Sequence, residues 1–275
     1  MATPSTWLKH WSGWILIAAV ISSGIAWTQQ ETGPAAKLQS ADAANHYIDP
    51  ALCTPCHSEI AARFAATGMG RSFYRMTAER AREDFTPGKT FYHKGSGSTF
   101  AMIERGGKYF QRRWQIGYDG NQTAVEVKQI DYVLGSGNHS RTYLHLTARG
   151  TLQELALSWY SERGGYFAMS PGYDTADYPG SSRSIHYECM FCHNAYPKIP
   201  KGNEEEGSEA RFLGPLPEGI DCQRCHGPGG KHLEVVGQTN STIEQVRMSI
   251  VNPARLPPEQ EMEVCSMRPV NPSGG

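Results

Sequence analysis

Alternation of apolar and polar residues is strongest in the middle of the 275-residue chain. Five runs alternate in this way, at residues 98–104, 108–116, 123–133, 151–160 and 166–169. Turn residues separate them: Gly106-Gly107, Asp119-Gly120 and Gly164-Gly165. Gly-Gly and Asp-Gly between such runs are typical of hairpins in antiparallel sheets. The pattern predicts a β module over about residues 88–170, with a three-stranded meander followed by a second hairpin.

Helical spacing flanks this module on both sides. Ile60 and Phe64 lie one turn apart and predict a short helix. The charged residues 76–84 predict a second one. Near the end, residues 241–244 have the spacing of a capping box that opens a helix, and a further helix is expected over residues 257–265. We therefore expect an irregular α+β fold of short helices and loops into which an antiparallel β module is inserted.

An apolar run occupies residues 11–27, directly after Lys9 and His10. It is shorter than the roughly 20 residues of a comfortable membrane span and longer than many signal-peptide cores. The small residues at 24–26 favour cleavage, whereas tryptophans at both ends favour a retained membrane anchor. Residues 28–45, rich in Gln, Ala and Gly, follow as a linker. Both alternatives place the rest of the chain in the periplasm or on the outer face of the inner membrane.

One short motif, Cys-x-x-Cys-His, occurs three times. The copies are Cys53, Cys56 and His57; Cys189, Cys192 and His193; and Cys222, Cys225 and His226. This spacing is the attachment signature of c-type haem. Two thiols three positions apart can form thioethers with both vinyl groups of one porphyrin, and the histidine then supplies the proximal iron ligand. The sequence predicts three covalently bound haem c groups, one at each motif.

Two other functions of paired cysteines are weaker alternatives. The pairs beginning at Cys189 and Cys222 are close enough in sequence to form one tetrahedral zinc site, but such a site needs no histidine directly after each pair. A thioredoxin-like redox dithiol needs a single pair beside a βαβ pattern, which surrounds none of the three motifs.

Composition limits the remaining possibilities. The formal charge is -1, so the chain has no basic surplus that favours nucleic acid. Hydrophobic residues make up 39% of the chain, which is modest for its length, and haem rings would supplement this apolar core. The expected partners are redox proteins, and the membrane if the N-terminal segment is retained.

The second axial ligand of each iron decides whether a haem carries electrons or binds a substrate. Six histidines remain outside the motifs and the N-terminal segment: His46, His93, His139, His145, His186 and His232. His232 follows a Gly/Pro turn that swings it away from its own haem, which favours ligation of a neighbouring one. His139 and His145 flank a Gly-Ser-Gly segment and one of them is expected to ligate. His93 lies on a predicted strand, where a hydrogen-bonding role is equally favoured.

Three longer sequence segments resemble those of one protein family. They are Tyr132-Val-Leu-Gly-Ser-Gly-Asn-His-Ser-Arg-Thr-Tyr-Leu144, Met169-Ser-Pro-Gly-Tyr173 and Cys222-Gln-Arg-Cys-His-Gly-Pro-Gly229. They resemble the periplasmic multihaem cytochromes related to the tetrahaem electron carrier of ammonia oxidisers, the cytochrome c five-five-four type domain, which tetratricopeptide repeats often follow. The resemblance covers roughly residues 46–265. It implies electron transfer through closely stacked haems, with His232 and His139 as distal ligands.

The chain departs from this family near its end. Where such cytochromes have a fourth Cys-x-x-Cys-His, this chain has Cys265 followed by an atypical tail at residues 266–275. Cys265 is interpreted as the remnant of a lost fourth site in a truncated chain, and an ordinary free cysteine is the alternative.

The expected function is electron transfer through three periplasmic haems. The alternative is an enzyme in which one haem iron keeps an open position and acts on a small nitrogen or sulfur compound. We predict an electron carrier rather than an enzyme.

Overall fold

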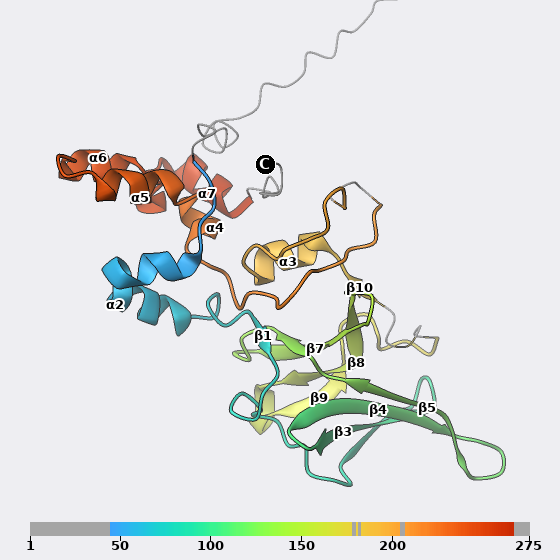
Figure 1. The fold of residues 1–275 in the computed structure, drawn as a ribbon. Helices are drawn as coiled ribbons and strands as arrows, with labels where there is room; N and C mark the ends of the chain where they lie inside the picture. Colours follow the sequence, from blue (N-terminus) through green and yellow to red (C-terminus); the bar gives the residue numbers. More distant parts are fainter. Residues whose placement is uncertain (1–44, 178–179, 181–182, 204–206, 267–275) are drawn as a thin grey trace, which may run out of the picture.

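A computed structural model describes residues 45–177, 180, 183–203 and 207–266. Two antiparallel sheets lie together at one end of the molecule, and most of the helices gather at the other (Figure 1). The predicted N-terminal signal or anchor (1–27), almost all of the linker (28–45) and residues 267–275 of the predicted tail lie outside the described residues. Within the described part, no helix is long and apolar enough to cross a membrane.

The four-stranded sheet is a meander with the strand order β2-β3-β4-β5. Its strands are β2 (Thr90–His93), β3 (Ser98–Arg105), β4 (Lys108–Ile116) and β5 (Gln122–Gln129). Gly106 and Gly107 make the β3–β4 turn with positive φ angles of 59° and 75°, which glycine adopts without strain. A register shift between Arg113 and Gln115 marks an irregularity in the β4–β5 pairing.

The six-stranded sheet has the order β1-β6-β7-β8-β10, with β9 also paired to β8. Its strands are β1 (Phe73–Arg75), β6 (Tyr132–Leu134), β7 (Ser140–Leu146), β8 (Leu152–Tyr160), β9 (Tyr166–Met169) and β10 (Ser184–Ile185). The short η2 helix (Glu162–Gly164) lies between β8 and β9. The β1 and β10 strands bring residues from both ends of the β module into this one sheet.

The six-stranded sheet is covered by apolar side chains on both faces. Tyr74, Val133 and Tyr143 contribute to an inter-sheet core, which also contains Phe100 of β3. Their chain neighbours point the other way, because side chains alternate along a strand. These neighbours form an outer core with a buried helix residue and part of the 210–216 segment: Phe73, Tyr132, Leu144, Met190, Phe212 and Leu216.

Short helices carry the three motifs and the C-terminal region. They are η1 (Pro50–Cys53), α2 (Thr54–Ala65), α3 (Tyr187–His193), α4 (Gln223–His226), α5 (Gly230–Gly237), α6 (Ile243–Met248), η3 (Pro253–Arg255) and α7 (Pro258–Ser266). The α2 and α6 helices have no buried residue, and α5 has only Gly230. Hydrophobic burial therefore contributes little to these helices, since most helix stability comes from packing an apolar face.

The predicted α+β class and the predicted hairpins are confirmed, as are the helices after His57, near residue 243 and over residues 257–265. The capping box lies one residue later than predicted, on Thr242 and Gln245. The β module extends beyond residues 88–170, because β1 and β10 join it. The helix predicted over residues 76–84 is wrong: this segment is irregular, and its Glu83 side chain is buried against Arg141.

Candidate functional site

Each of the three motifs lies in or beside a short helix. Cys53 ends η1, and the other two residues of the first motif lie in the first turn of α2. The second motif fills the last five residues of α3, and the third begins at Cys222, immediately before α4. None of the six motif cysteines forms a disulfide in the described part of the chain, and Cys56, Cys189 and Cys192 are exposed. These thiols are open to covalent attachment.

The first and third motifs are direct neighbours, although the whole β module separates them in sequence. Burial, followed by the adjacent Cys222 thiol, raises the pKa of Cys53. The buried Gln223 side chain fixes this contact. Its Oε1 accepts from the Ile48 N–H at 2.9 Å and its Nε2 donates to the Ile48 carbonyl at 2.8 Å. The same Oε1 accepts from the Gly229 N–H, so one amide joins the two motif regions.

A backbone contact strengthens this association. The N–H of Gly219 donates to the Phe73 carbonyl at 2.7 Å, and that of Ile220 donates to the Met69 carbonyl at 3.1 Å. The chain just before the third motif therefore pairs with the chain that leaves α2.

Arg224, inside the third motif, connects it to the second. Its Nη2 donates to the carbonyls of Asn194 and Ala195, at 3.0 and 3.1 Å, directly after the second motif. Its guanidinium carbon lies 4.6 Å from the ring centre of Phe191 and 4.1 Å from that of Tyr196. Nε and Nη1 of Arg224 are buried and have no partner among the described residues. They are charged donors of the kind that binds carboxylates.

The imidazoles of His57, on α2, and His232, on α5, lie close to each other. Their ring centres lie 6.5 Å apart, and their planes differ by 23°. Two imidazoles that bind one metal ion from opposite sides, each at a metal–nitrogen distance of about 2 Å, have centres about 6 Å apart. The distance between the ring centres of His57 and His232 is therefore close to that of two imidazoles on one metal ion.

Hydrogen bonds fix the tautomers of two of the site histidines. Nδ1 of His226 lies 2.7 Å from the Val251 carbonyl, which can only accept, so Nδ1 carries the proton. Nδ1 of His232 lies 2.9 Å from Ser249 Oγ, whose own proton goes to the Val246 carbonyl. His232 therefore also donates from Nδ1. In both rings Nε2 keeps a free lone pair, the arrangement that metal-binding histidines use.

His193 lies in a different environment. It is the last residue of α3, and burial lowers its pKa, which favours the neutral imidazole. Its Nδ1 is buried without a hydrogen-bond partner in the described part of the chain. Its carbonyl accepts from Ser72 Oγ at 2.6 Å, so the residues just after α2 also contact the second motif. A neutral imidazole is the form that ligates a metal.

The other predicted ligands do not join this centre in the structure. Both ring nitrogens of buried His93 are engaged, with Ser96 Oγ at 2.9 Å and Asp174 Oδ1 at 3.0 Å. His145 lies between Leu144 and Leu146 on β7 and points away from the outer core, toward Asp131 at 3.0 Å. Exposed His139 lies in the loop before β7. His93 and His145 therefore make their polar contacts outside the motif helices.

The donor set differs from that of a protein-only metal site. Among the described residues, no three His, Cys, Asp or Glu side chains converge closely enough to hold a metal ion. A zinc site draws three or four ligands from the protein, whereas haem iron draws only one or two.

Sequence reasoning missed the residues that hold the centre together. Gln223 and Arg224 occupy the variable positions between two motif cysteines, where the motif itself requires no particular side chain. Ser249 and Val251 lie after α6, far from any motif in sequence. No short-range signal indicates the contacts of these residues.

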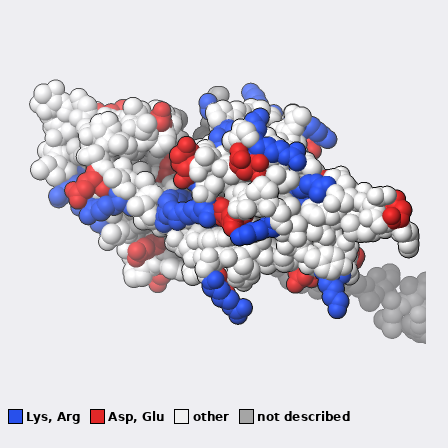
Figure 2. All heavy atoms as spheres, turned by 90° about the horizontal axis from the view of Figure 1, so that it is seen from below, with Lys and Arg blue, Asp and Glu red and all other residues white. Residues whose placement is uncertain are grey.

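Positive and negative side chains are interspersed over the face shown in Figure 2, with no broad patch of one sign in view. No protein-family model, curated protein or solved structure matches the chain.

Proposed function

We infer that this protein is an extracytoplasmic electron carrier with three covalent haem c groups. The observation that carries the inference is the opposition of His57 and His232, with ring centres 6.5 Å apart, at the first Cys-x-x-Cys-His motif. His232 was predicted to ligate a neighbouring haem, and its position opposite His57 supports this assignment.

Each proposed haem would be held by one pair of thiols and by the histidine that follows them. His57, His193 and His226 would be the proximal ligands, and His232 would be the distal ligand at the first motif. The buried, unpaired donors of Arg224 are suited to a propionate carboxylate. When bound, the iron supplies reversible one-electron chemistry.

The exposure of apolar side chains near two of the motifs also supports this proposal. Around the first and third motifs, large apolar side chains lie exposed: Leu52, Ile60, Met69, Leu233 and Val236. A large apolar side chain that is exposed beside a proposed attachment site is one that the attached group could cover. Porphyrin rings attached at Cys53 and Cys222 would cover this region and act as core material for α2 and α5.

The arrangement favours electron transfer over substrate chemistry. Two imidazoles on one iron leave no position for a substrate, and the contact between Cys53 and Cys222 would bring two haems close together. Close neighbours allow an electron to pass between irons, and a redox partner protein would supply or remove it.

The test is a haem count on protein matured in a host that attaches c-type haem. We expect three covalent haems per chain by pyridine haemochrome absorbance, with the haem at the first motif low-spin and inert to carbon monoxide. Bound zinc without haem would overturn the assignment. Rapid carbon monoxide binding at the first motif would instead favour an enzyme with an open iron.

A further inference from the structure

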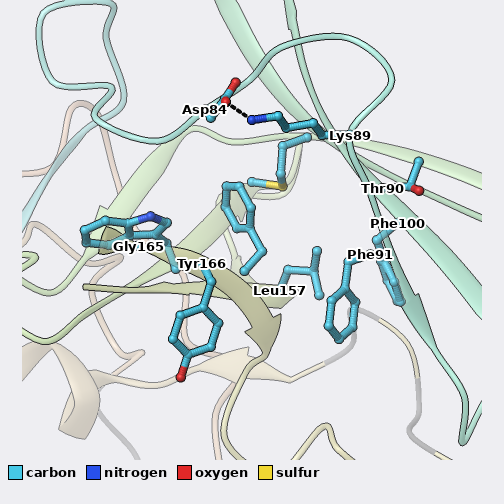
Figure 3. Close-up of a pocket in the computed structure, with 11 residues that line it drawn as sticks. Asp84, Lys89, Thr90, Phe91, Phe100, Leu157, Gly165 and Tyr166 are labelled. Atoms are coloured by element: carbon cyan, nitrogen blue, oxygen red, sulfur yellow. Dashed lines mark hydrogen bonds and ion pairs between the residues drawn. The ribbon is translucent and has the colours of Figure 1, made fainter. Parts of the chain in front are cut away.

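A cavity of about 340 Å³ lies between the two sheets, in the β module (Figure 3). It is bounded by β2, β3, β8 and β9, and by residues 84–89, which lead into β2. Its volume is at the lower end of the range for small-molecule sites. Its deep residues belong to the inter-sheet core, so the six-stranded sheet separates it from the second motif.

The wall of this cavity is apolar and largely aromatic. Phe100, Met102 and Leu157 are almost fully buried and form its deep side. Phe91 lies beside Phe100, with ring centres 6.4 Å apart. Trp159 and the half-exposed Tyr166 complete the wall. Aromatic faces favour flat ring systems, which stack on them or meet them edge to face.

Gly165 keeps Trp159 in place at this wall. Its backbone has a φ of 96°, and a Cβ on it would lie 2.6 Å from Cζ2 of the indole. Only glycine allows the chain to pass so close to the ring. The shape of the cavity is therefore set by the fold before any ligand arrives, which lowers the cost of binding.

The charged groups of the cavity form one ion pair. Lys89 Nζ contacts Asp84 Oδ2, as the dashed line in Figure 3 shows, and Asp84 Oδ1 accepts from the Thr86 N–H at 2.8 Å. The pair is electrically neutral, so it gives no net attraction to an ionic ligand. An ammonium group has three donor hydrogens, so Lys89 can also donate to an uncharged oxygen.

We propose that this cavity binds an uncharged aromatic molecule of one or two rings that carries a hydroxyl or carbonyl oxygen, a phenol or a quinone. The rings lie between Phe91 and Trp159, and Lys89 donates to the oxygen. This site is independent of the proposed haem centre, because no motif residue lines it.

The test uses the haem-loaded protein and 2-naphthol as the probe, with the free probe measured by fluorescence after equilibrium dialysis. We expect saturable binding of one equivalent per chain. Phe91→Ala should weaken binding at least about tenfold, the effect of losing one good contact. Tyr92→Ala is the matched control, because Tyr92 is the next residue on β2 and is 62% exposed; it should leave binding unchanged.

Two further variants keep the test decisive if Phe91→Ala folds poorly. Thr90→Trp places a large ring at an exposed strand position that lines the cavity and should block binding. Lys89→Met should weaken 2-naphthol binding several-fold and leave naphthalene binding unchanged, whereas Lys94→Met should change neither.

Several results would overturn the proposal. One is binding that does not saturate, or that Phe91→Ala and Tyr92→Ala affect equally. Another is tighter binding of 2-naphthalenesulfonate than of 2-naphthol, which would show that the cavity prefers an anion. Tighter binding of decanoate, which has no ring, would show that the cavity does not require an aromatic ligand. The last is a shift of the Soret band on saturation, which would place the probe at an iron.

Discussion

The backbone of Gly219 lies directly against that of Gly70, so that a Cβ on Gly219 would be 2.2 Å from the Gly70 carbonyl oxygen. This contact brings the chain entering the third motif against the chain leaving the first. We predict that Gly219→Ala destabilises the protein by about 1–3 kcal/mol more than Gly214→Ala, because overpacking at a rigid contact costs about that much. Urea unfolding measures both.

Gly214→Ala is the control because its φ of 65° is close to the 60° of Gly219, while a Cβ there would meet no atom within 4 Å. Equal losses in the two variants would mean that only the backbone angle matters and that the contact with Gly70 is unimportant.

Removal of the His232 side chain should leave one axial position free at one haem iron. In haem-loaded His232→Ala protein, we expect one haem per chain to become high-spin and to bind carbon monoxide, because His57 would then be its only protein ligand. Carbon monoxide titration followed in the Soret band measures this. His93→Gln should leave the haem spectra unchanged, since both ring nitrogens of His93 are already hydrogen bonded. Unchanged spectra in His232→Ala would contradict the ligand assignment.

The buried ion pair between Arg141 and Glu83 should contribute strongly to stability. The two groups lie 3.0 Å apart, with side-chain exposures of 3% and 0%. Burial, and then Glu83, raises the pKa of Tyr143, so its hydroxyl stays protonated and donates to the same carboxylate. Arg141→Met leaves this carboxylate buried without its cation and should cost about 3–5 kcal/mol in urea unfolding.

The control for this pair is Arg149→Met. Arg149 pairs with Glu209 at 2.6 Å, but its side chain is 74% exposed. Exposed pairs contribute about 0–1 kcal/mol. A similar small loss in Arg141→Met would show that the buried pair is replaceable.

Without haem, the two ends of the molecule should differ in stability. In protein made without c-type maturation, we expect rapid proteolysis within residues 45–66 and 220–266, because α2 and α6 bury no residue of their own. Residues 73–169, which contain most of the inter-sheet core, should persist as a fragment. Mass spectrometry of the digests identifies the cut sites. Equal protection of the helical regions with and without haem would contradict the view that haem completes their core.

Glu154 should make stability depend on pH. Burial raises its pKa, and Arg183, which donates to it at 2.8 Å, opposes this shift only in part. As pH rises from the ordinary range of a glutamate to this raised value, the unfolded chain loses its proton first, so the free energy of unfolding falls. Glu154→Gln removes the titrating carboxyl group and with it this decrease in the free energy of unfolding. Relative to the natural protein, the variant should therefore become more stable as pH rises above the ordinary pKa of a glutamate, as urea unfolding at several pH values would measure. A constant difference between the two proteins would contradict the assignment.

Turn chemistry and alternation predicted the hairpins well, because both act over a few neighbouring residues. Residues 123–133 were predicted as one strand, but β5 ends at Gln129 and β6 begins at Tyr132 in the other sheet. Asp131, between them, accepts from the Leu146 N–H at 2.8 Å. The break depends on this long-range contact, which periodicity does not show.

In the candidate site, too, sequence signals predict the features that depend on neighbouring residues and not those that depend on long-range contacts. Residue spacing within five positions identified the three motifs, whereas the proposed distal ligand depends on tertiary contacts. His232 faces His57 because Gln223 joins α4 to the chain before η1 and Ser249 orients the imidazole. Similarly, residues 76–84 have the charge of an exposed helix, whereas the buried Arg141 and Tyr143 side chains explain why Glu83 turns inward.

The six-stranded sheet, apolar on both faces, has a consequence for its register. In a sheet with one solvent-exposed face, shifting the pairing of a strand by one residue exposes its buried side chains and is costly. In β7 such a slip would exchange Tyr143 for Leu144, one apolar residue for another, so hydrophobicity alone discriminates poorly between the two alignments. Hydroxyl groups make the distinction: Thr142, Ser158 and Ser170 are linked at 2.9 and 2.8 Å, and Ser170 donates to the Leu155 carbonyl. A slipped strand would leave these polar atoms without hydrogen-bond partners in the interior of the protein. The few hydroxyl groups of the sheet therefore select its register, whereas its many apolar side chains stabilise it.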